Sequence, residues 1–550
     1  MIKPMEYEGL KQTLAGDVAT DPETIRTHSR DASIFKYVPQ AVVFPKDAED
    51  VKKLVAFVAR EKQGHPELSV TARSAGTDMT GGPLSESIVV SFTKYLNHFS
   101  IDGETATVEP GVYYRDFEKE TLARGLLMPS YPASKSLSAL GGIVNNNSGG
   151  EKTLRYGKTS NYVEEMTMVL SDGNSYTFGP ISREMLEGKK SQQDFEGDLY
   201  RRVHGLIEEH YDKIQAARPH VAKNSAGYAL WDVWSRETGI FDMTKLFVGG
   251  QGTLGIMTQA KLKLVKVKPK TRLAVLFFKG IGRLPNVVNK LLPLHPESLE
   301  VFDDKTLMLA FRFFPEIAKR AGENLLTFAW KFLPEALIGM ELLGVPKLVV
   351  LVEFAEDTDE EVEEKLSELG KVIKQYRVPH RLIHDPHDAE KYWIIRRESF
   401  NLLRQHVKNK SATPFVDDFI VEPKYLPEVL PKVYEVLKAY GIKGTLAGHA
   451  GSGNFHIIPL MDLSKESERN KIGPVSETIY DLVLKHDGST TAEHGDGLIR
   501  GAYLEKMFGP DVYNLFVEIK HIFDPQNIFN PGKKIGVDFK EALEHINQEG

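Results

Sequence analysis

Three histidines and one glutamate lie in two short glycine-rich segments near the carboxyl end of the chain. The segment GHAGSGNFH places His449 and His456 seven positions apart, and AEHGDG adds Glu493 and His494. Two histidines and one carboxylate suit a borderline divalent cation such as Zn²⁺ or Mn²⁺. Imidazole also titrates near neutral pH, so His494 could serve as a base rather than as a ligand. A structural role is the alternative, and the residue types alone leave it open.

Two further segments consist largely of small and polar residues. Residues 73–82 (RSAGTDMTGG) lie between strand-like segments, and their backbone N–H groups could form a nest for a pyrophosphate. They lack the Gly-Lys-Ser/Thr ending of a P-loop, which argues against nucleoside triphosphate chemistry. Residues 141–157 (GGIVNNNSGGEKTLRYG) could supply backbone and amide hydrogen bonds to a large polar ligand. A plain surface loop is the alternative for both.

The segment GQGTLG at residues 250–255 matches the G-x-G-x-x-G pattern of dinucleotide-binding folds. A nicotinamide site needs a helix after this loop, whereas residues 256–265 (IMTQAKLKLV) alternate like a strand. No acidic residue follows at the distance of about 20 positions that such sites show. The pattern therefore predicts a tight turn between strands, where glycine still permits close approach to a cofactor.

The elements that must position these residues form two groups along the chain. In the first, residues 47–62 are expected to be a helix capped by Asp47, and residues 113–125 a second helix. Short strands are expected at residues 68–72, 87–92 and 105–112, and in the segment 164–173 (EEMTMVLSDG), which ends in a turn at Asp172-Gly173.

A change of composition at residues 266–270 (KVKPK) predicts a boundary. Strands are expected beyond it at 273–280 and 347–354, with an acidic amphipathic helix at 357–375, as in a separate α+β domain. Residues 306–345 are rich in Phe, Leu, Ala and Trp, which favours packed helices, with a membrane-surface or partner-binding face as the alternative.

The composition bounds the class of protein. The 550 residues suggest two to four domains, and the net charge of -7 gives no sign of a nucleic-acid binder. The absence of cysteine excludes disulfides, thiolate metal sites, cysteinyl-flavin links and iron–sulfur clusters held by this chain. No signal peptide and no transmembrane segment are expected, so we predict a cytoplasmic protein, with peripheral contact at the inner face of a membrane left open.

Taken together, the motifs resemble those of one flavoprotein family. They are PQAVVFPKDAEDV, RSAGTDMTGG, VEPGV, GGIVNNNSGG, GGQGTLGI, GHAGSGNFH, AEHGDGLIR and FDPQNIFNPGKK, and they match in order and spacing from about Arg30 to Ile535. The family is that of vanillyl-alcohol oxidase and p-cresol methylhydroxylase. The likeness is to its D-lactate, glycolate and D-2-hydroxyglutarate dehydrogenase branch.

The resemblance implies an α+β fold with a two-subdomain FAD-binding domain of the p-cresol methylhydroxylase type, an α+β substrate (cap) domain and a C-terminal helical segment. We expect an N-terminal helical segment at 1–35, the FAD-binding domain at 36–268, the cap domain at 269–460, and a segment that returns to the FAD domain at 461–550.

The resemblance also implies non-covalent FAD, because Thr77 and Asp78 stand where covalent members often carry histidine. The residues expected to bind the cofactor are Arg73, Ser74, Ala75, Gly76, Thr77, Gly81, Gly82, Pro132, Gly142, Asn147, Ser148, Gly150, Tyr156, Gly252, Gly255, Ile256 and Asn530.

For the chemistry, the resemblance implies that His449, His456 and Glu493 bind a divalent metal, Zn or Mn, and that His494 is the base. Arg396 would pair with the substrate carboxylate. Its neighbour Arg397 and a surface salt bridge are the alternatives. Two positions depart from the family pattern, since Ser452 replaces the usual Asp and Gln251 the usual Glu.

The activity implied is oxidation of a D-2-hydroxy acid to the 2-keto acid, with electrons passed to a quinone, cytochrome, flavoprotein or Fe–S partner rather than to NAD. We expect no fused Fe–S domain of the kind that longer relatives carry. A homodimer is a further expectation. The rival functions are an alkyl-dihydroxyacetone-phosphate synthase-like transferase, a flavoprotein oxidase that uses oxygen, and an FAD-binding subunit of a glycolate-oxidase-like complex.

Overall fold

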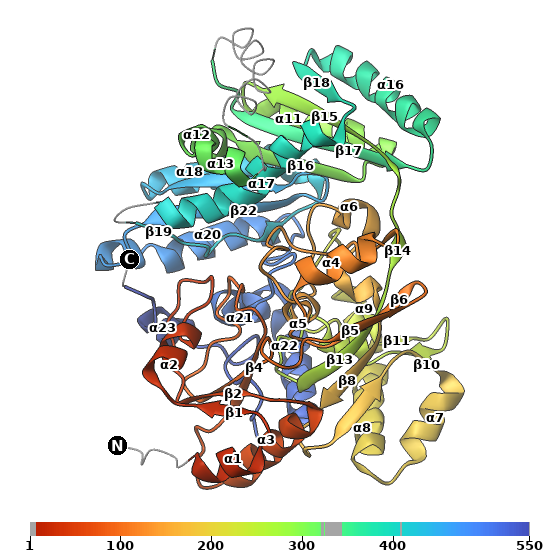
Figure 1. Cartoon of the computed structure of the whole chain (residues 1–550), viewed down its shortest axis with the longest axis vertical. Helices are drawn as coiled ribbons and strands as arrows, with labels where there is room; N and C mark the ends of the chain where they lie inside the picture. Colours follow the sequence, from red (N-terminus) through yellow and green to blue (C-terminus); the bar gives the residue numbers. More distant parts are fainter. Residues whose placement is uncertain (1–6, 321–323, 325–343, 407–409, 549–550) are drawn as a thin grey trace.

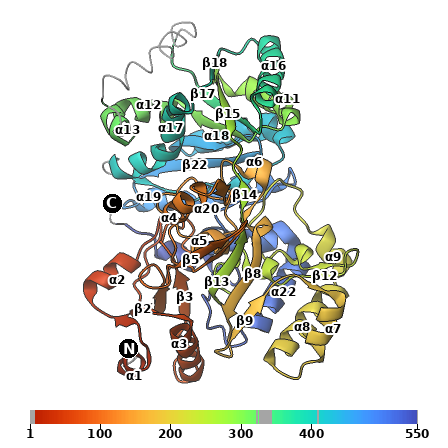
Figure 2. The same cartoon turned by 45° about the vertical axis from the view of Figure 1, so that its right-hand side comes forward.

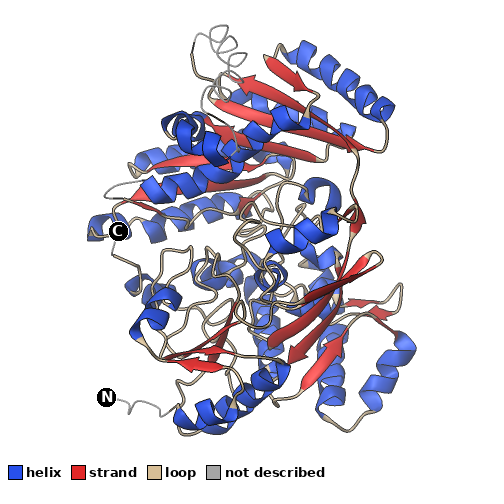
Figure 3. Cartoon of the chain, viewed as in Figure 1, coloured by secondary structure: helices blue, strands red, loops and turns tan. Residues whose placement is uncertain are grey.

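The computed structural model describes residues 7–320, 324, 344–406 and 410–548, which form two α+β lobes (Figure 1). The first lobe contains a four-stranded and a five-stranded sheet, and the second contains one eight-stranded sheet (Figure 3). The predicted α+β class is confirmed. The predicted glycine-rich loops lie where the two lobes meet.

The four-stranded sheet has the order β1-β2-β4-β3, and β2, β3 and β4 run parallel to one another. Its strands are β1 (Asp17–Ala19), β2 (Ala41–Phe44), β3 (Val70–Arg73) and β4 (Ile88–Ser91). Helix α3 (Ala48–Glu61) connects β2 to β3, and its apolar face is buried. The side chain of Asp47 caps α3 by accepting from the N–H of Asp50 at 3.0 Å, as the sequence predicted. The first 35 residues contribute β1 as well as the expected helices.

The five-stranded sheet is antiparallel throughout, with the order β5-β6-β13-β8-β9. Its strands are β5 (Phe99–Asp102), β6 (Thr105–Val108), β8 (Val163–Val169), β9 (Ser175–Phe178) and β13 (Ile256–Lys263). The GQGTLG loop leads into the strand β13 rather than into a helix, as predicted, but it follows the short helix α10 (Thr244–Phe247) and so is not a turn between two strands.

The core of the first lobe includes helices from both ends of the chain. They are α4 (Tyr114–Leu122), α5 (Leu140–Asn145), α8 (Phe195–Glu209) and α22 (Leu504–Phe523). Leu515, Phe516 and Ile519 of α22 are buried in this core. The tail returns as well, because Ile528 accepts a hydrogen bond from the N–H of Val70 in β3 at 2.8 Å.

The eight-stranded sheet begins directly after the predicted boundary at 266–270 and is antiparallel at every pairing. Its strands are β15 (Lys270–Phe278), β16 (Ser298–Asp303), β17 (Leu348–Glu356), β18 (His380–Ile383), β19 (Ser411–Ala412), β20 (Phe419–Ile420), β21 (Lys443–His449) and β22 (Asn454–Met461).

Alternate residues of β15 face opposite sides of this sheet, and each side is covered by helices. Figure 2 shows α11, α16 and α18 on one side and α12, α13 and α17 on the other. The helices on the first side are α11 (Leu284–Leu291), α16 (Asp359–Tyr376) and α18 (Leu426–Ala439), and α20 (Ile472–Leu484) belongs to the same core. The second set is α12 (Asp304–Arg312), α13 (Phe314–Arg320) and α17 (Pro386–His406).

Two expectations about the second half of the chain need comment. Helix α20 belongs to the second lobe because it packs on α18, so the return to the first lobe begins after Leu484 rather than at 461. Most of the apolar segment 306–345 lies outside the described residues, so both interpretations of it stay predictions. None of the described helices is long and apolar enough to cross a membrane.

Candidate active site

A cavity of about 430 Å³ lies between the glycine-rich loops of the first lobe and the sheet of the second. The second lobe contributes Thr306, Thr445, Ala447 and Ile458 to its wall. The predicted cofactor residues in the wall are Arg73, Ser74, Ala75, Gly76, Thr77, Gly82, Pro132, Gly142, Ser148 and Gly252. Three segments far apart in sequence therefore face one space.

The residues around this cavity fit FAD. Arg73 is buried, and its Nη1 has no hydrogen-bond partner among the described residues, so a cationic donor stands ready for an anionic group. A Cβ added to Gly142 would have the Ser74 Cβ, 3.9 Å away, as its nearest neighbour, so the backbone is open on that side. The Nη2 of Arg73 donates to the Arg30 carbonyl at 2.8 Å, so Nη1 is the donor left for a ligand. Small residues and a cationic donor suit a loop that binds a pyrophosphate.

Seven of the predicted cofactor residues lie outside the cavity wall. They are Gly81, Asn147, Gly150, Tyr156, Gly255, Ile256 and Asn530. Asn530 instead joins loops, because its Nδ2 donates to the carbonyls of Gly82 at 2.9 Å and Gln251 at 2.8 Å. Tyr156 turns to the second lobe, with its hydroxyl 3.4 Å from Glu297. A sequence motif does not distinguish residues that line the cavity from residues that support its loops without facing the cavity.

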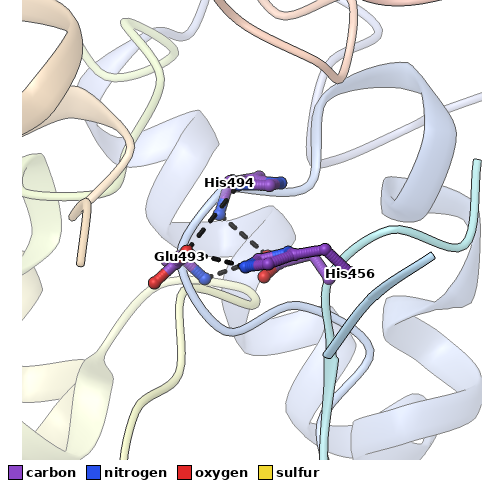
Figure 4. A group of neighbouring side chains, drawn as sticks. His456, Glu493 and His494 are labelled. Carbon is purple, nitrogen blue, oxygen red and sulfur yellow. Dashed lines mark hydrogen bonds and ion pairs between the residues drawn. The ribbon is translucent and has the colours of Figure 1, made fainter. Parts of the chain in front are cut away.

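Three of the predicted site residues, His456, Glu493 and His494, lie close together (Figure 4), and all three line the cavity. Oε1 of Glu493 lies 3.0 Å from Nε2 of His449, 3.2 Å from Nε2 of His456 and 3.8 Å from Nε2 of His494. The rings of His456 and His494 stack, with centroids 5.0 Å apart. His456, Glu493 and His494 line the cavity, whereas His449 lies behind them.

A tight hairpin explains how two of these histidines come together. Strands β21 and β22 pair so that His449 lies opposite Asn454 and His456 opposite Ala447. The connecting turn includes Gly453 at φ 78°, where a Cβ would lie 1.9 Å from the Val421 carbonyl oxygen. Only glycine satisfies both constraints.

Two aspartates immediately before β20, Asp417 and Asp418, hold the loop that carries Glu493 and His494. Oδ2 of Asp418 accepts hydrogen bonds from three consecutive N–H groups, of Ala492, Glu493 and His494, at 2.8 to 2.9 Å. Oδ2 of Asp417 accepts from Nδ1 of His494 at 2.9 Å, and its Oδ1 from Arg500 at 2.6 Å. Both aspartate side chains thus hold the loop that carries two of the predicted site residues.

The charges around the site shift the titration of its members. Burial alone would lower the pKa of His494, but the carboxylates of Asp418 and Asp417 outweigh it and raise the pKa to about 9. Burial lowers the pKa of His456, which favours the neutral ring that a metal ligand needs. Burial would raise the pKa of Glu493, but Lys223 and His449 hold it well below its usual range.

The donor set fits a divalent cation. Ligand atoms of Asp418, His456, Glu493 and His494 lie within 4.8 Å of one another. Asp418 is the least suited of these, because its Oδ2 already accepts from three N–H groups and from Thr491 Oγ1 at 2.5 Å. The remaining residues, His456, Glu493 and His494, form a set that Zn²⁺ or Mn²⁺ accepts. This set includes His494, the predicted base, and not His449, the predicted ligand.

Both candidate arginines of α17 line the cavity. Arg396 pairs with Glu300 at 3.0 Å, and Oε1 of Glu300 also lies 2.7 Å from Nδ1 of His449. Arg397 makes two contacts to Glu151, at 2.5 and 3.0 Å. Arg396 is thus connected to the histidine cluster, whereas Arg397 joins the second lobe to the loop of the first.

Sequence reasoning missed Lys223, Glu300 and Glu151. Lys223 is buried and its ammonium contacts Oε2 of Glu493, 270 positions along the chain. No spacing rule relates such distant residues. The only available signal was their charge in otherwise apolar or small-residue segments.

Comparison with known proteins agrees with this geometry. Residues 39–179 match the FAD binding domain family, and residues 268–534 match the family of FAD linked oxidases, C-terminal domain. The chain is 27% identical over 537 residues to the D-2-hydroxyglutarate dehydrogenase of Pantoea ananatis, covering 95% of this chain and 50% of that protein. The chain thus spans about half the length of several curated relatives that it matches.

Other relatives are of similar length. The chain is 26% identical to the D-2-hydroxyglutarate dehydrogenase of Stutzerimonas stutzeri, covering 97% of this chain and 99% of that protein. It is also 26% identical to the glycolate oxidase subunit GlcD of Bacillus subtilis, covering 92% of each.

Solved structures share the fold over nearly the whole chain. An alkyldihydroxyacetonephosphate synthase superposes with a TM-score of 0.67 at 14% identity, covering 96% of this chain and 86% of that one. A p-cresol methylhydroxylase superposes with a TM-score of 0.65 at 17% identity, covering 96% of each chain. With both family matches in place, the chain belongs to the FAD-linked oxidase family, as a flavoprotein oxidoreductase with the fold of p-cresol methylhydroxylase.

Proposed function

We propose that the protein oxidises a D-2-hydroxy acid to the corresponding 2-keto acid, with FAD bound non-covalently and a divalent cation at the histidine cluster. The observation that carries the proposal is the shared cavity. One wall holds the glycine-rich loops and Arg73, and the end of the same space holds His456, Glu493 and His494 beside Arg396. Relatives named for 2-hydroxy-acid chemistry support the substrate class.

In this proposal FAD supplies the two-electron oxidant and the cation a Lewis acid that acidifies the substrate hydroxyl. In its neutral form, which predominates only at alkaline pH because its pKa is raised to about 9, His494 accepts the hydroxyl proton at Nε2, while Asp417 holds the ring through Nδ1. Arg396 pairs with the substrate carboxylate and fixes which face of C2 meets the oxidant. Loss of the C2 hydrogen as hydride and of the hydroxyl proton leaves the 2-keto acid.

The side chains proposed to hold the cation are His449, His456 and Glu493, and those proposed to surround FAD are the predicted loop residues that line the cavity. The reduced cofactor would be reoxidised by a quinone, cytochrome, flavoprotein or Fe–S partner. The likeness to a glycolate oxidase subunit favours one further candidate, an FAD-binding subunit that needs a partner for turnover.

Anaerobic mixing of the purified protein with a panel of D- and L-2-hydroxy acids tests the proposal through the flavin absorbance near 450 nm, a band of the cofactor itself. We expect one D-acid to bleach it, and a chelator to abolish the bleaching. A yellow protein that no acid bleaches would favour the alkyl-transfer or subunit function. Bleaching without steady turnover would favour the subunit.

A further inference from the structure

One cationic side chain lies directly behind the proposed cation site. The side chain of Lys223 is fully buried, with 0% of its surface exposed, and its ammonium contacts Oε2 of Glu493, which is 3% exposed. Gly149 closes over the pair, since a Cβ there would lie 3.0 Å from Glu493 Oε2 and 3.5 Å from Lys223 Cδ. The loop of residues 141–157, to which Gly149 belongs, therefore shields the ion pair from water.

The two oxygens of Glu493 have different surroundings. Oε2 is taken by Lys223, whereas Oε1 faces the Nε2 atoms of His449 at 3.0 Å and His456 at 3.2 Å. Because the lysine occupies one oxygen, only the other is directed at the histidines. A cation held there would meet this carboxylate through a single oxygen.

Lys223 also sets the charge of the site. Two other buried acids near the cluster pair with cations, Glu300 with Arg396 at 3.0 Å and Asp417 with Arg500 at 2.6 Å, whereas Asp418 is held by backbone N–H groups and the Thr491 hydroxyl. With Lys223 opposite Glu493, the protein brings nearly balanced charge to the place where a dication would sit. The charge of a bound dication is then left for the substrate carboxylate and the hydroxyl that it acidifies.

We propose that Lys223 is a positioning residue that acts through Glu493, keeping it a one-oxygen, charge-neutralised ligand so that the cation binds less tightly but polarises the substrate more strongly. This inference rests on the proposed function. Removing the charge of Lys223 should therefore strengthen cation binding and slow the reaction. Loss of a merely structural ion pair would weaken both.

The test uses the FAD-loaded protein and Lys223→Met, with Zn²⁺ as the probe. Zn²⁺ affinity is measured by competition with a chelator of known affinity, and turnover with a D-2-hydroxy acid and a dye acceptor at saturating Zn²⁺. A unit charge removed a few ångströms from a dication should raise Zn²⁺ affinity at least about tenfold, and we expect kcat to fall by about tenfold or more. Affinity is read without any activity assay.

Lys534→Met is the matched control, because Lys534 and Asp496 form a second fully buried pair, at 2.5 Å, that does not contact the histidines. It should leave Zn²⁺ affinity unchanged. Weaker or unchanged Zn²⁺ binding by Lys223→Met that retains FAD would overturn the inference. If that variant fails to retain FAD, Lys223→Gln, which keeps a hydrogen-bond donor without the charge, is measured in the same way.

A measurement on the unaltered protein is independent of both variants. In a crystal structure of the Zn²⁺-loaded wild type we expect one Glu493 oxygen on the metal and Lys223 on the other. Ligation of the metal by both oxygens of Glu493 would overturn the inference about Lys223 but not the proposed cation site. A wild type that binds no Zn²⁺ in the competition assay would instead overturn the proposed cation site, whatever Lys223 does.

Discussion

Nδ1 of His494 lies 2.9 Å from Oδ2 of Asp417, and that carboxylate also receives the guanidinium of Arg500 through its other oxygen. The raised pKa of about 9 keeps the ring protonated on both nitrogens near neutral pH. When it loses a proton at more alkaline pH, the carboxylate, which can only accept, keeps the remaining proton on Nδ1, and Nε2 then carries the lone pair. Nε2 is also the ring nitrogen 3.8 Å from Glu493. The ring is thus oriented, by a buried anion, with its acceptor toward the proposed cation site.

Replacing His494 with glutamine tests the base. An amide cannot take up the hydroxyl proton, so we expect turnover to fall by about 100-fold or more, the range of general-base contributions, while FAD content stays at the wild-type level. His486→Gln is the control, because His486 is also buried but bonds to the Leu482 carbonyl at 2.8 Å, away from the cavity. Wild-type turnover in His494→Gln would show that another group takes the proton.

Gln251 connects three loops around the cavity, and its amide donor faces the carboxylate of Asp78. Its Nε2 lies 3.2 Å from Thr80 Oγ1 and 3.5 Å from Asp78 Oδ2, while its Oε1 accepts from the N–H groups of Asp496 and Gly497. Gln251→Glu would place a carboxylate beside that of Asp78 and remove the donor. We expect a loss of about 2 kcal/mol in stability and a lower thermal midpoint.

The double variant Gln251→Glu/Asp78→Asn supplies the check on that pairing. If the two side chains are coupled, the asparagine should restore at least about half of the lost stability, since interacting neighbours give non-additive effects. Strictly additive losses in the two single variants and the double variant would refute the coupling. Coupling of the two side chains would explain why this chain has Gln251 where the family pattern has Glu.

The local elements were predictable, because their signals lie within a few residues. The helix at 48–61 has its cap, its apolar spacing and its buried face in one segment, and β13 shows its alternation directly. The three histidines and Glu493 were also predictable, since each pair lies within one short motif. What spacing could not show is which loop residues face the cavity and which, like Asn530, support the loop from behind.

The partners of the site residues were not predictable from local pattern. Glu300 lies in β16 and reaches His449 across the sheet, 149 positions away, and Lys223 reaches Glu493 from an irregular segment. The first contact depends on which strands pair in the second lobe, and the second on how a C-terminal loop packs on the first lobe. Buried charge in a sequence indicates that a partner exists, but tertiary structure alone decides which one it is.

Asp31 gives the stability of the protein a defined pH dependence. Its carboxyl borders the cavity and accepts from Ser33 at 2.5 and 2.8 Å, while Oδ2 has no partner among the described residues. Burial first, and the Asp78 carboxylate second, raise the pKa of Asp31 to about 7. In the unfolded chain the ordinary pKa is about 4, so between about pH 4 and 7 the folded state holds the extra proton.

Stability therefore falls with rising pH across that window, because the contribution present below about pH 4 is lost as pH passes about 7. Asp31→Asn removes this dependence, and at pH 8 we expect it to be more stable than the wild type by up to roughly 4 kcal/mol. Thermal midpoints of the FAD-free protein from pH 5 to 8 measure the difference. Asp102→Asn, at an exposed strand end, removes one charge without burial and should leave the wild-type slope intact.

The two neighbouring arginines of α17 can be separated by kinetics. Arg396 is attached through Glu300 to His449, at the end of the cavity where the substrate carboxylate is proposed to bind. Lysine cannot reproduce a two-pronged contact, so Arg396→Lys should raise the KM for the acid by about tenfold or more. Arg397 is held by Glu151 of the opposite lobe, so Arg397→Lys should mainly lower the thermal midpoint. Adjacent side chains of a helix point about 100° apart, so only one of the two arginines is expected to reach the substrate carboxylate. A KM raised only in Arg397→Lys would show that Arg397, and not Arg396, binds it.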